Sequence, residues 1–102
     1  MPDPVYTHGL WRVQPGHEEA FIAAWEALAD VFASSTEGPF WGTLLRSTAD
    51  TSVFYSFGPW RSQQDILLMR ADPVAQQAIA RIREHCREAI PEICELVRHV
   101  TT

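Results

Sequence analysis

Three side chains in apolar segments have the chemistry to stabilise negative charge developing on a substrate. Trp60 follows the apolar run 52–58, and its indole N–H can donate a hydrogen bond to a substrate oxygen. Arg12 and Arg46 lie in apolar segments, where a guanidinium can hold an anionic or enolate oxygen. Each also has a structural alternative: the tryptophan as a core anchor, and the arginines as solvent-facing or interface residues.

Histidines and tyrosines in the predicted strands are candidates for proton transfer. His8 and His99 carry imidazoles, which act as general bases near neutral pH. Tyr6 and Tyr55 can relay protons or stabilise an oxyanion. Packing within the sheet or at an interface is the alternative role for all four residues.

The sequence does not predict a metal site. His85, Cys86, Cys94 and His99 follow no ligand spacing such as C-x-x-C or H-x-x-x-H, and the group spans a predicted helix and a predicted strand. His17 and His85 have the pattern of exposed helix residues. Both cysteines are expected to be free thiols, as in proteins of a reducing compartment.

The composition predicts one globular domain that binds neither nucleic acid nor membrane. The chain has 102 residues, which suits a single domain over residues 1–102. Its net charge of −5, with only 8 Lys and Arg, opposes binding to a phosphate backbone. No apolar run is long enough to cross a bilayer, and the first residues lack the pattern of a signal peptide. We therefore expect a cytoplasmic protein.

Alternating and helical patterns divide the chain into strands and helices. The predicted strands cover residues 5–13, 40–47, 52–58 and 93–100. A polar turn at 48–51 joins the middle two strands into a hairpin. Pro59 is expected to end the third strand, because proline cannot donate to a ladder.

The predicted helices cover residues 17–33, 60–69 and 72–90. Ser62 is the expected N-cap of the short helix. Asp72 and Pro73 suit the N-cap and first turn of the last helix, which Pro91 is expected to end. The apolar stripe expected on that helix consists of Val74, Ala78, Ile82, Cys86 and Ala89.

This element order favours an α+β, ferredoxin-like βαββαβ fold: a four-stranded antiparallel sheet with helices on one face. The third strand has Val53, Tyr55 and Phe57 on one side and Phe54 on the other, so both faces of the sheet are apolar. Helices on one face leave the other without cover. We therefore expect a homodimer in which a second copy covers that face.

Three segments carry a resemblance to a known family. Residues 54–64 (FYSFGPWRSQQ) resemble the third strand and short helix of antibiotic biosynthesis monooxygenase domains. Residues 13–21 (VQPGHEEAF) resemble the junction between their first strand and first helix. Residues 71–73 (ADP) resemble the start of their second main helix. The resemblance covers nearly the whole chain and implies the dimeric α/β-barrel arrangement.

The resemblance also implies an activity. Members of this family include enzymes that oxidise polycyclic anthrones with dioxygen and no cofactor, and an asparagine, a tryptophan and a tyrosine are their proposed working residues. The matching positions here hold Ser56, Trp60 and Ile66. Another branch degrades haem, and the three positions important there hold Gly9, Met69 and Ile79. None of these three offers the imidazole that haem ligation needs, so haem binding is not expected.

The fold predicts a pocket between the sheet and the helices. The resemblance implies a cofactor-independent monooxygenase acting on a small, hydrophobic, polyketide- or quinone-like aromatic. The candidate catalytic residues are Trp60, Ser56 and Arg46. The expected substrate-binding residues are Thr7, Gly9, Trp11, Phe54 and Ile66. Gly9 and Ser56 are small, which favours open space beside the sheet.

Two alternatives remain. One is a dimer of the same fold that binds a small molecule without catalysis. The other is a structural family member whose pocket is filled by large side chains, namely Trp11, Phe21, Trp25 and Trp60.

Overall fold

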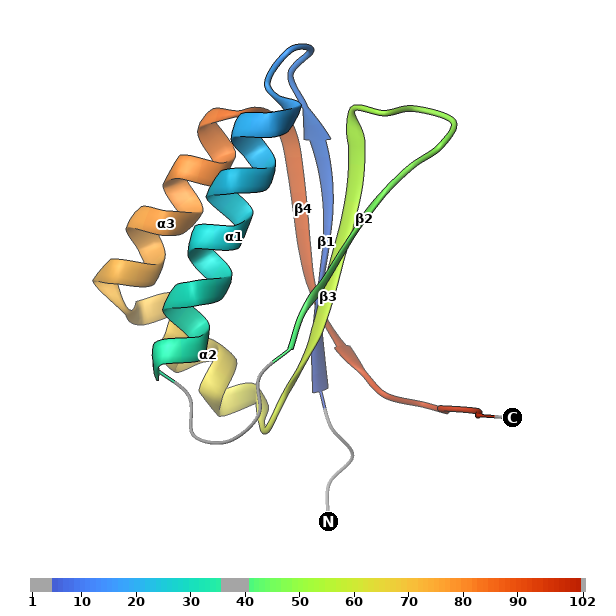
Figure 1. Ribbon diagram of the computed structural model, residues 1–102. Helices are drawn as coiled ribbons and strands as arrows, with labels where there is room; N and C mark the ends of the chain where they lie inside the picture. Colours follow the sequence, from blue (N-terminus) through green and yellow to red (C-terminus); the bar gives the residue numbers. More distant parts are fainter. Residues whose placement is uncertain (1–4, 36–40, 102) are drawn as a thin grey trace.

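In the part of the chain that the structure describes, a four-stranded antiparallel sheet carries three helices on one face (Figure 1). The computed structural model describes residues 5–35 and 41–101. Strand order across the sheet is β2–β3–β1–β4. The elements are β1 (Val5–Val13), α1 (Glu18–Ser35), β2 (Thr43–Arg46), β3 (Val53–Trp60), α2 (Gln63–Ala71), α3 (Pro73–Glu84) and β4 (Cys86–Glu95). This confirms the predicted α+β, ferredoxin-like fold.

The β2–β3 hairpin confirms the predicted turn. Ser47 N–H donates to the carbonyl of Val53 at 2.9 Å. The Asp50 carboxylate accepts from the Ser52 hydroxyl at 2.6 Å and from its N–H at 3.0 Å, and these hydrogen bonds hold the pKa of Asp50 below its usual value. β2 begins only at Thr43, later than predicted. The expected strand residue Phe40 lies outside the described residues.

β3 continues through Pro59 to Trp60, so the prediction that Pro59 ends the strand is wrong. Pro59 pairs with Tyr6, and Trp60 pairs with Val5. The pairing of β3 with β2 ends at Phe57. Among the described residues, no strand pairs with that side of β3 beyond Phe57, and a residue without an N–H is tolerated there. Trp60 therefore belongs to the sheet rather than to the start of a helix.

The N-caps of α2 and α3 are those predicted. The Ser62 hydroxyl accepts from Asp65 N–H at 3.2 Å, and the Asp72 carboxylate accepts from Val74 N–H at 3.1 Å. Because the cap is Ser62, α2 begins at Gln63 and not at residue 60. Both caps satisfy backbone donors that the first helical turn leaves unpaired.

The boundary between α3 and β4 was predicted wrongly. α3 ends at Glu84, and Cys86 to Glu95 form β4, where the sequence suggested a helix as far as residue 90 and a strand at 93–100. Gln14 forms hydrogen bonds with the carbonyls at the helix end. Its backbone N–H donates to the carbonyl of His85 at 2.9 Å, and its side-chain amide donates to the carbonyl of Glu84 at 3.2 Å. Pro91 does not end a helix but lies within β4, which tolerates it as an edge strand.

The helical stripe is displaced accordingly. Val74 is 57% exposed, while Ala75 and Ile82 are buried. Ala89 pairs with Trp11 in the sheet, so it belongs to β4 rather than to the helix. Cys86 keeps its expected contact with the core, from the first residue of β4 instead of the last turn of α3.

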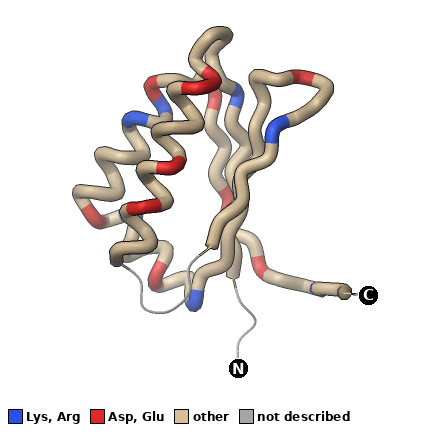
Figure 2. Tube along the Cα trace, viewed as in Figure 1, with Lys and Arg blue, Asp and Glu red and all other residues tan. Residues whose placement is uncertain are grey.

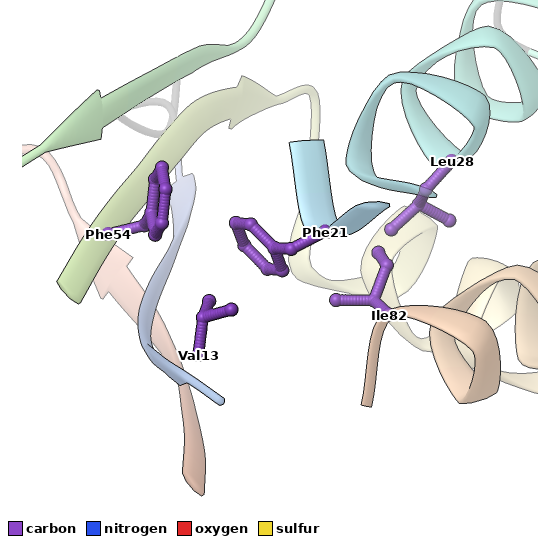
Figure 3. Close-up of a cluster of buried hydrophobic side chains, with 5 residues drawn as sticks. All are labelled: Val13, Phe21, Leu28, Phe54 and Ile82. Atoms are coloured by element: carbon purple, nitrogen blue, oxygen red, sulfur yellow. The ribbon is translucent and has the colours of Figure 1, made fainter. Parts of the chain in front are cut away.

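The hydrophobic core lies between the sheet and helices α1 and α3. Its central cluster consists of Val13, Phe21, Leu28, Phe54 and Ile82 (Figure 3). The rings of Phe21 and Phe54 lie 4.8 Å apart between centroids, and those of Phe21 and Trp11 lie 5.7 Å apart. Because side chains alternate along a strand, the burial of Phe54 against α1 identifies the helix-covered face of the sheet.

The opposite face of the sheet exposes several large apolar side chains and, in the described part of the chain, no helix covers it (Figure 1). Tyr55 is 38% exposed, Leu45 50% and Ile90 39%. The Trp41 ring lies edge-on to Tyr6 and Phe57, with centroid distances of 6.2 and 6.3 Å. β3 carries no charged residue, whereas charged residues are spread along the helices (Figure 2). We call this surface the open face.

Candidate functional site

Two tryptophan–hydroxyl pairs lie on the helix-covered face of the sheet and cross from β1 to β3. Trp11 Nε1 donates a hydrogen bond to Ser56 Oγ at 2.9 Å. Trp60 Nε1 donates to Thr7 Oγ1 at 3.0 Å. Ser56 pairs with Gly9, two positions along β1 from Thr7, so the two pairs are neighbours on one face. The structure thus brings together four of the predicted site residues around Gly9.

Gly9 is what allows Trp11 and Ser56 to meet. A Cβ atom at Gly9 would lie 2.7 Å from Trp11 Nε1 and 2.8 Å from Ser56 Oγ, which is closer than real Cβ contacts. The small residues Gly9 and Ser56 were expected to leave open space beside the sheet. Instead, the Trp11 indole occupies the space directly above Gly9.

Trp60 is both an anchor and a donor whose hydrogen bond is already in use. It is 8% exposed, and its ring lies edge-on to Phe32 of α1 with centroids 5.3 Å apart. Its N–H points to Thr7 Oγ1. A substrate oxygen at this position must share the indole N–H with the Thr7 hydroxyl or replace that hydroxyl as the acceptor. The hydroxyl protons of Thr7 and Ser56 are not used in the two indole hydrogen bonds and remain donors.

Arg46 lies at the other end of the helix-covered face from Trp60. It pairs with Phe54, and its guanidinium carbon is 4.8 Å from the centroid of the Phe54 ring. Its side chain is 39% exposed and approaches Glu19 at 4.0 Å. Phe54 and Trp60 are six positions apart on β3, which is about 20 Å along a strand. The structure therefore does not bring Arg46 and Trp60 together.

Phe54 and Ile66, two of the predicted substrate-binding residues, have almost no contact with solvent. Phe54 is 1% exposed and belongs to the core cluster, and Ile66 of α2 is 0% exposed. Thr7 and Trp11 are only partly buried. Of the predicted lining, these two are therefore better placed to meet a ligand than Phe54 or Ile66.

The remaining candidates for proton transfer lie away from this site. Tyr6, His8 and Tyr55 alternate with the buried residues of their strands, so they belong to the open face. His99 is exposed in the segment after β4. Arg12 also belongs to the open face, where it forms an exposed ion pair with Glu88 at 3.4 Å.

Cys86 borders a shallow hollow of about 180 Å³, which is lined by Arg83, Cys86, Arg87, Glu88 and Ala89. Burial raises the pKa of the Cys86 thiol, although the nearby Arg83 acts in the opposite direction. The thiol donates to the carbonyl of Ile82 at 3.4 Å. Both cysteines are free, as predicted.

One contact between titratable side chains was missed by sequence reasoning. His17 and His85, which were expected to be exposed helix residues, lie next to helix ends and contact each other through their rings. They are 68 positions apart in the sequence, and no spacing pattern connects them. Only the fold brings them together.

The fold and the site define the class of this protein: a ferredoxin-like α+β domain with a tryptophan-rich, helix-covered sheet face and an open face that exposes apolar side chains. The sequence profile of the antibiotic biosynthesis monooxygenase family matches residues 4–81. The chain belongs to the antibiotic biosynthesis monooxygenase family. A comparison with curated protein sequences gives no match.

Solved structures give the same fold. A mutant of SnoaB, a cofactor-independent oxygenase from Streptomyces nogalater, superposes with a TM-score of 0.86 at 18% identity, over 98% of this chain and 99% of that one. PA3566 from Pseudomonas aeruginosa has a TM-score of 0.74 at 20% identity, over 96% and 98% of the two chains. A conserved protein from Methanosarcina mazei Go1 has a TM-score of 0.78 at 11% identity, over 91% and 92%. At these identities the likeness establishes the fold.

Proposed function

We propose that the protein is a cofactor-independent monooxygenase that acts on a small hydrophobic aromatic substrate, of the polyketide or quinone-precursor type. The observation that carries this proposal is the pair of indole–hydroxyl contacts, Trp11–Ser56 and Trp60–Thr7, on the helix-covered face. Membership of the family and the fold of SnoaB support it. We further propose that residues 1–102 form one domain and that it works in the cytoplasm.

In this reaction the substrate itself reduces dioxygen, so the protein needs no redox group of its own. An ionised phenol or enol passes an electron to dioxygen, and a carbon–oxygen bond then forms at the activated ring carbon. That carbon loses two hydrogens and becomes a carbonyl; one oxygen atom stays in the product and the other leaves as water. The substrate supplies the electrons, so the protein has only to exclude water, favour the anion and hold the geometry.

The side chains of the site suit these tasks. The Ser56 and Thr7 hydroxyls and the Trp60 indole N–H are neutral donors, which can stabilise an enolate oxygen without protonating it. Trp11 and Trp60 supply flat apolar surface for an aromatic ring. Ser56 and Thr7 lie between Arg46 and Trp60 in the register of the sheet, so we place the reacting oxygen near these two hydroxyls.

A non-catalytic binding dimer is the second candidate. Among residues 5–35 and 41–101, the hydrogen bonds of Ser56 and Thr7 on this face come from indoles rather than from a carboxylate or imidazole. A site of this kind binds an aromatic ligand without an obvious base to ionise it. Turnover under air separates the two candidates.

The open face supports a homodimer in either case. Its apolar side chains, including Tyr55, Leu45 and Ile90, are 38%, 50% and 39% exposed in the single chain. Covering them with a second copy removes this area from water, which is the usual driving force of association. The net charge of −5 opposes nucleic acid as a partner, and none of the helices in the described ranges is long and apolar enough to cross a membrane.

The test is oxygen consumption with an anthrone or a hydroquinone in air-saturated buffer. We expect turnover by the native protein and a reduction of about 10-fold in Ser56→Ala, because a lost hydrogen bond to a charged oxygen costs about 1.5 kcal/mol. Ser34→Ala is the matched control: Ser34 is exposed on α1, where its hydroxyl donates to the carbonyl of Asp30. Binding of the substrate without oxygen consumption would favour the second candidate.

A further inference from the structure

Two histidines meet where the turn between β1 and α1 touches the end of α3. Nδ1 of His17 lies 3.1 Å from Nδ1 of His85 in a hydrogen bond whose donor depends on the tautomers of the two rings, and the ring centroids are 5.4 Å apart. His17 directly precedes α1, and His85 directly follows α3. Both side chains are partly buried, so their rings keep some contact with solvent. Neither residue belongs to the site proposed above.

Gln14 holds the backbone on both sides of this contact. Its carbonyl accepts from His17 N–H at 2.9 Å, and its own N–H donates to the carbonyl of His85 at 2.9 Å. Its side-chain amide donates to the carbonyl of Glu84 at 3.2 Å. The backbone segments that carry the two imidazoles are thus held together by hydrogen bonds before any ligand arrives, which lowers the cost of organising a site.

The separation of 3.1 Å between the two nitrogens suits a shared metal ion. With metal–nitrogen bonds of about 2.05 Å, two nitrogens at this distance subtend roughly 98° at the ion, between octahedral and tetrahedral values. Each ring has to turn by only about 40° from the line joining the two nitrogens to aim its lone pair at the same point. Neutral imidazole is a good ligand for nickel, copper and zinc.

We propose that His17 and His85 form a two-imidazole site for a divalent transition-metal ion such as Ni²⁺, Cu²⁺ or Zn²⁺. The described residues contain no cluster of three or more His, Cys, Asp or Glu that could hold a metal, so water completes the coordination and the ion is exchangeable. Bound there, the ion ties the β1–α1 turn to the α3–β4 junction. The effect on the protein is added stability of the native fold.

Nickel binding to the tag-free native protein tests this directly by proton NMR. The chain has four histidines. Substituting His8 and His99 one at a time identifies their ring signals, and the two signals that remain belong to His17 and His85. Sub-stoichiometric Ni²⁺ is expected to broaden the ring signals of His17 and His85 while those of His8 and His99 stay sharp. Equal broadening of all four signals, or broadening of His99 alone, would overturn the proposal.

Thermal unfolding gives a second readout. With Ni²⁺ at about ten times its Kd, we expect the Tm of the native protein to rise by roughly 5–10 °C relative to protein in EDTA. The same rise is expected in His99→Gln, whose histidine is exposed in the segment after β4. It should be absent in His17→Gln and in His85→Gln. An equal rise in either of these two variants contradicts the site, whatever the outcome of the turnover assay.

Discussion

The contact between Gly9, Trp11 and Ser56 makes Gly9→Ala a sharp test of the site geometry. A new Cβ would lie 2.7 Å from Trp11 Nε1, 2.8 Å from Ser56 Oγ and 2.9 Å from Trp11 Cε2. Trp11 cannot swing away freely, because its ring packs against Phe21 of the core. The substitution must therefore displace the indole and break its hydrogen bond to Ser56.

The size of the effect follows from three terms. Overpacking costs about 1–3 kcal/mol. The lost hydrogen bond costs about 1 kcal/mol. Alanine recovers roughly 0.5–1 kcal/mol, because glycine loses more backbone entropy in a strand. We expect Gly9→Ala to lower the free energy of unfolding by about 2 kcal/mol, or to lower Tm by roughly 10 °C.

Denaturant unfolding and calorimetry measure this change, and the chain offers a matched control. A Cβ at Gly42 would meet its nearest atom, in the Trp25 ring, at 3.7 Å, which is an ordinary contact. Gly42→Ala is therefore expected to stay within about 0.5 kcal/mol of the native protein. Adding Trp11→Phe removes both ring atoms that the new Cβ would strike, so it should restore part of the stability lost in Gly9→Ala. Equal stability of Gly9→Ala and the native protein would refute this geometry.

Three further predictions concern the rest of the molecule. Trp60→Phe should cost little stability but reduce activity by about 5- to 30-fold through loss of its N–H donor, whereas Trp60→Ala should destabilise by about 3–5 kcal/mol; full turnover by Trp60→Phe would remove this residue from the site. Tyr55→Glu on the open face should give a monomer in light scattering, whereas substitution of Leu68, which is exposed on α2, by Glu should leave the dimer intact. A native protein that is already monomeric at micromolar concentration would contradict the homodimer. Burial raises the pKa of Cys86, so this thiol should react slowly with alkylating reagents near pH 8; labelling as fast as in the unfolded chain would contradict its burial. The stability that this raised pKa contributes should be complete below the ordinary pKa of 9.0 and should fall as the pH rises through the higher folded value.

Sequence patterns predicted correctly those elements that depend on local interactions alone. The strand Val5–Val13 and the caps Ser62 and Asp72 follow from alternation and from side chains that bond their own helix. The exposed apolar face was also predicted, because alternation along β3 assigns Tyr55 and Phe54 to opposite sides.

The errors occur where a tertiary contact overrides the local pattern. Proline at positions 59 and 91 was expected to end an element, but both residues lie in strands with a free edge, which the sequence does not reveal. The end of α3 depends on Gln14, which is 70 positions from the Glu84 carbonyl it binds. Residues after Glu84 fit a helical stripe as well as a strand, so the pattern alone could not choose.

The sequence indicated which residues share a face of the sheet but not how their side chains pack, and their roles in a site stay predictions. Thr7, Gly9, Trp11, Ser56 and Trp60 were all named from the sequence, and the structure places them on one face. Whether the Trp11 indole lines the space above Gly9 or fills it depends on its side-chain rotamer, which periodicity does not determine. The contact between His17 and His85 likewise depends on how the two helix ends meet.

The central claim, oxygenation without a cofactor, is tested most directly with isotopic dioxygen. EDTA-treated protein and an anthrone-type substrate are mixed under ¹⁸O₂, and the product is analysed by mass spectrometry beside a protein-free control. The proposed chemistry predicts one ¹⁸O atom in each product molecule, with formation much faster than in the control. A rate equal to that of the protein-free control, or a product without ¹⁸O, would contradict it.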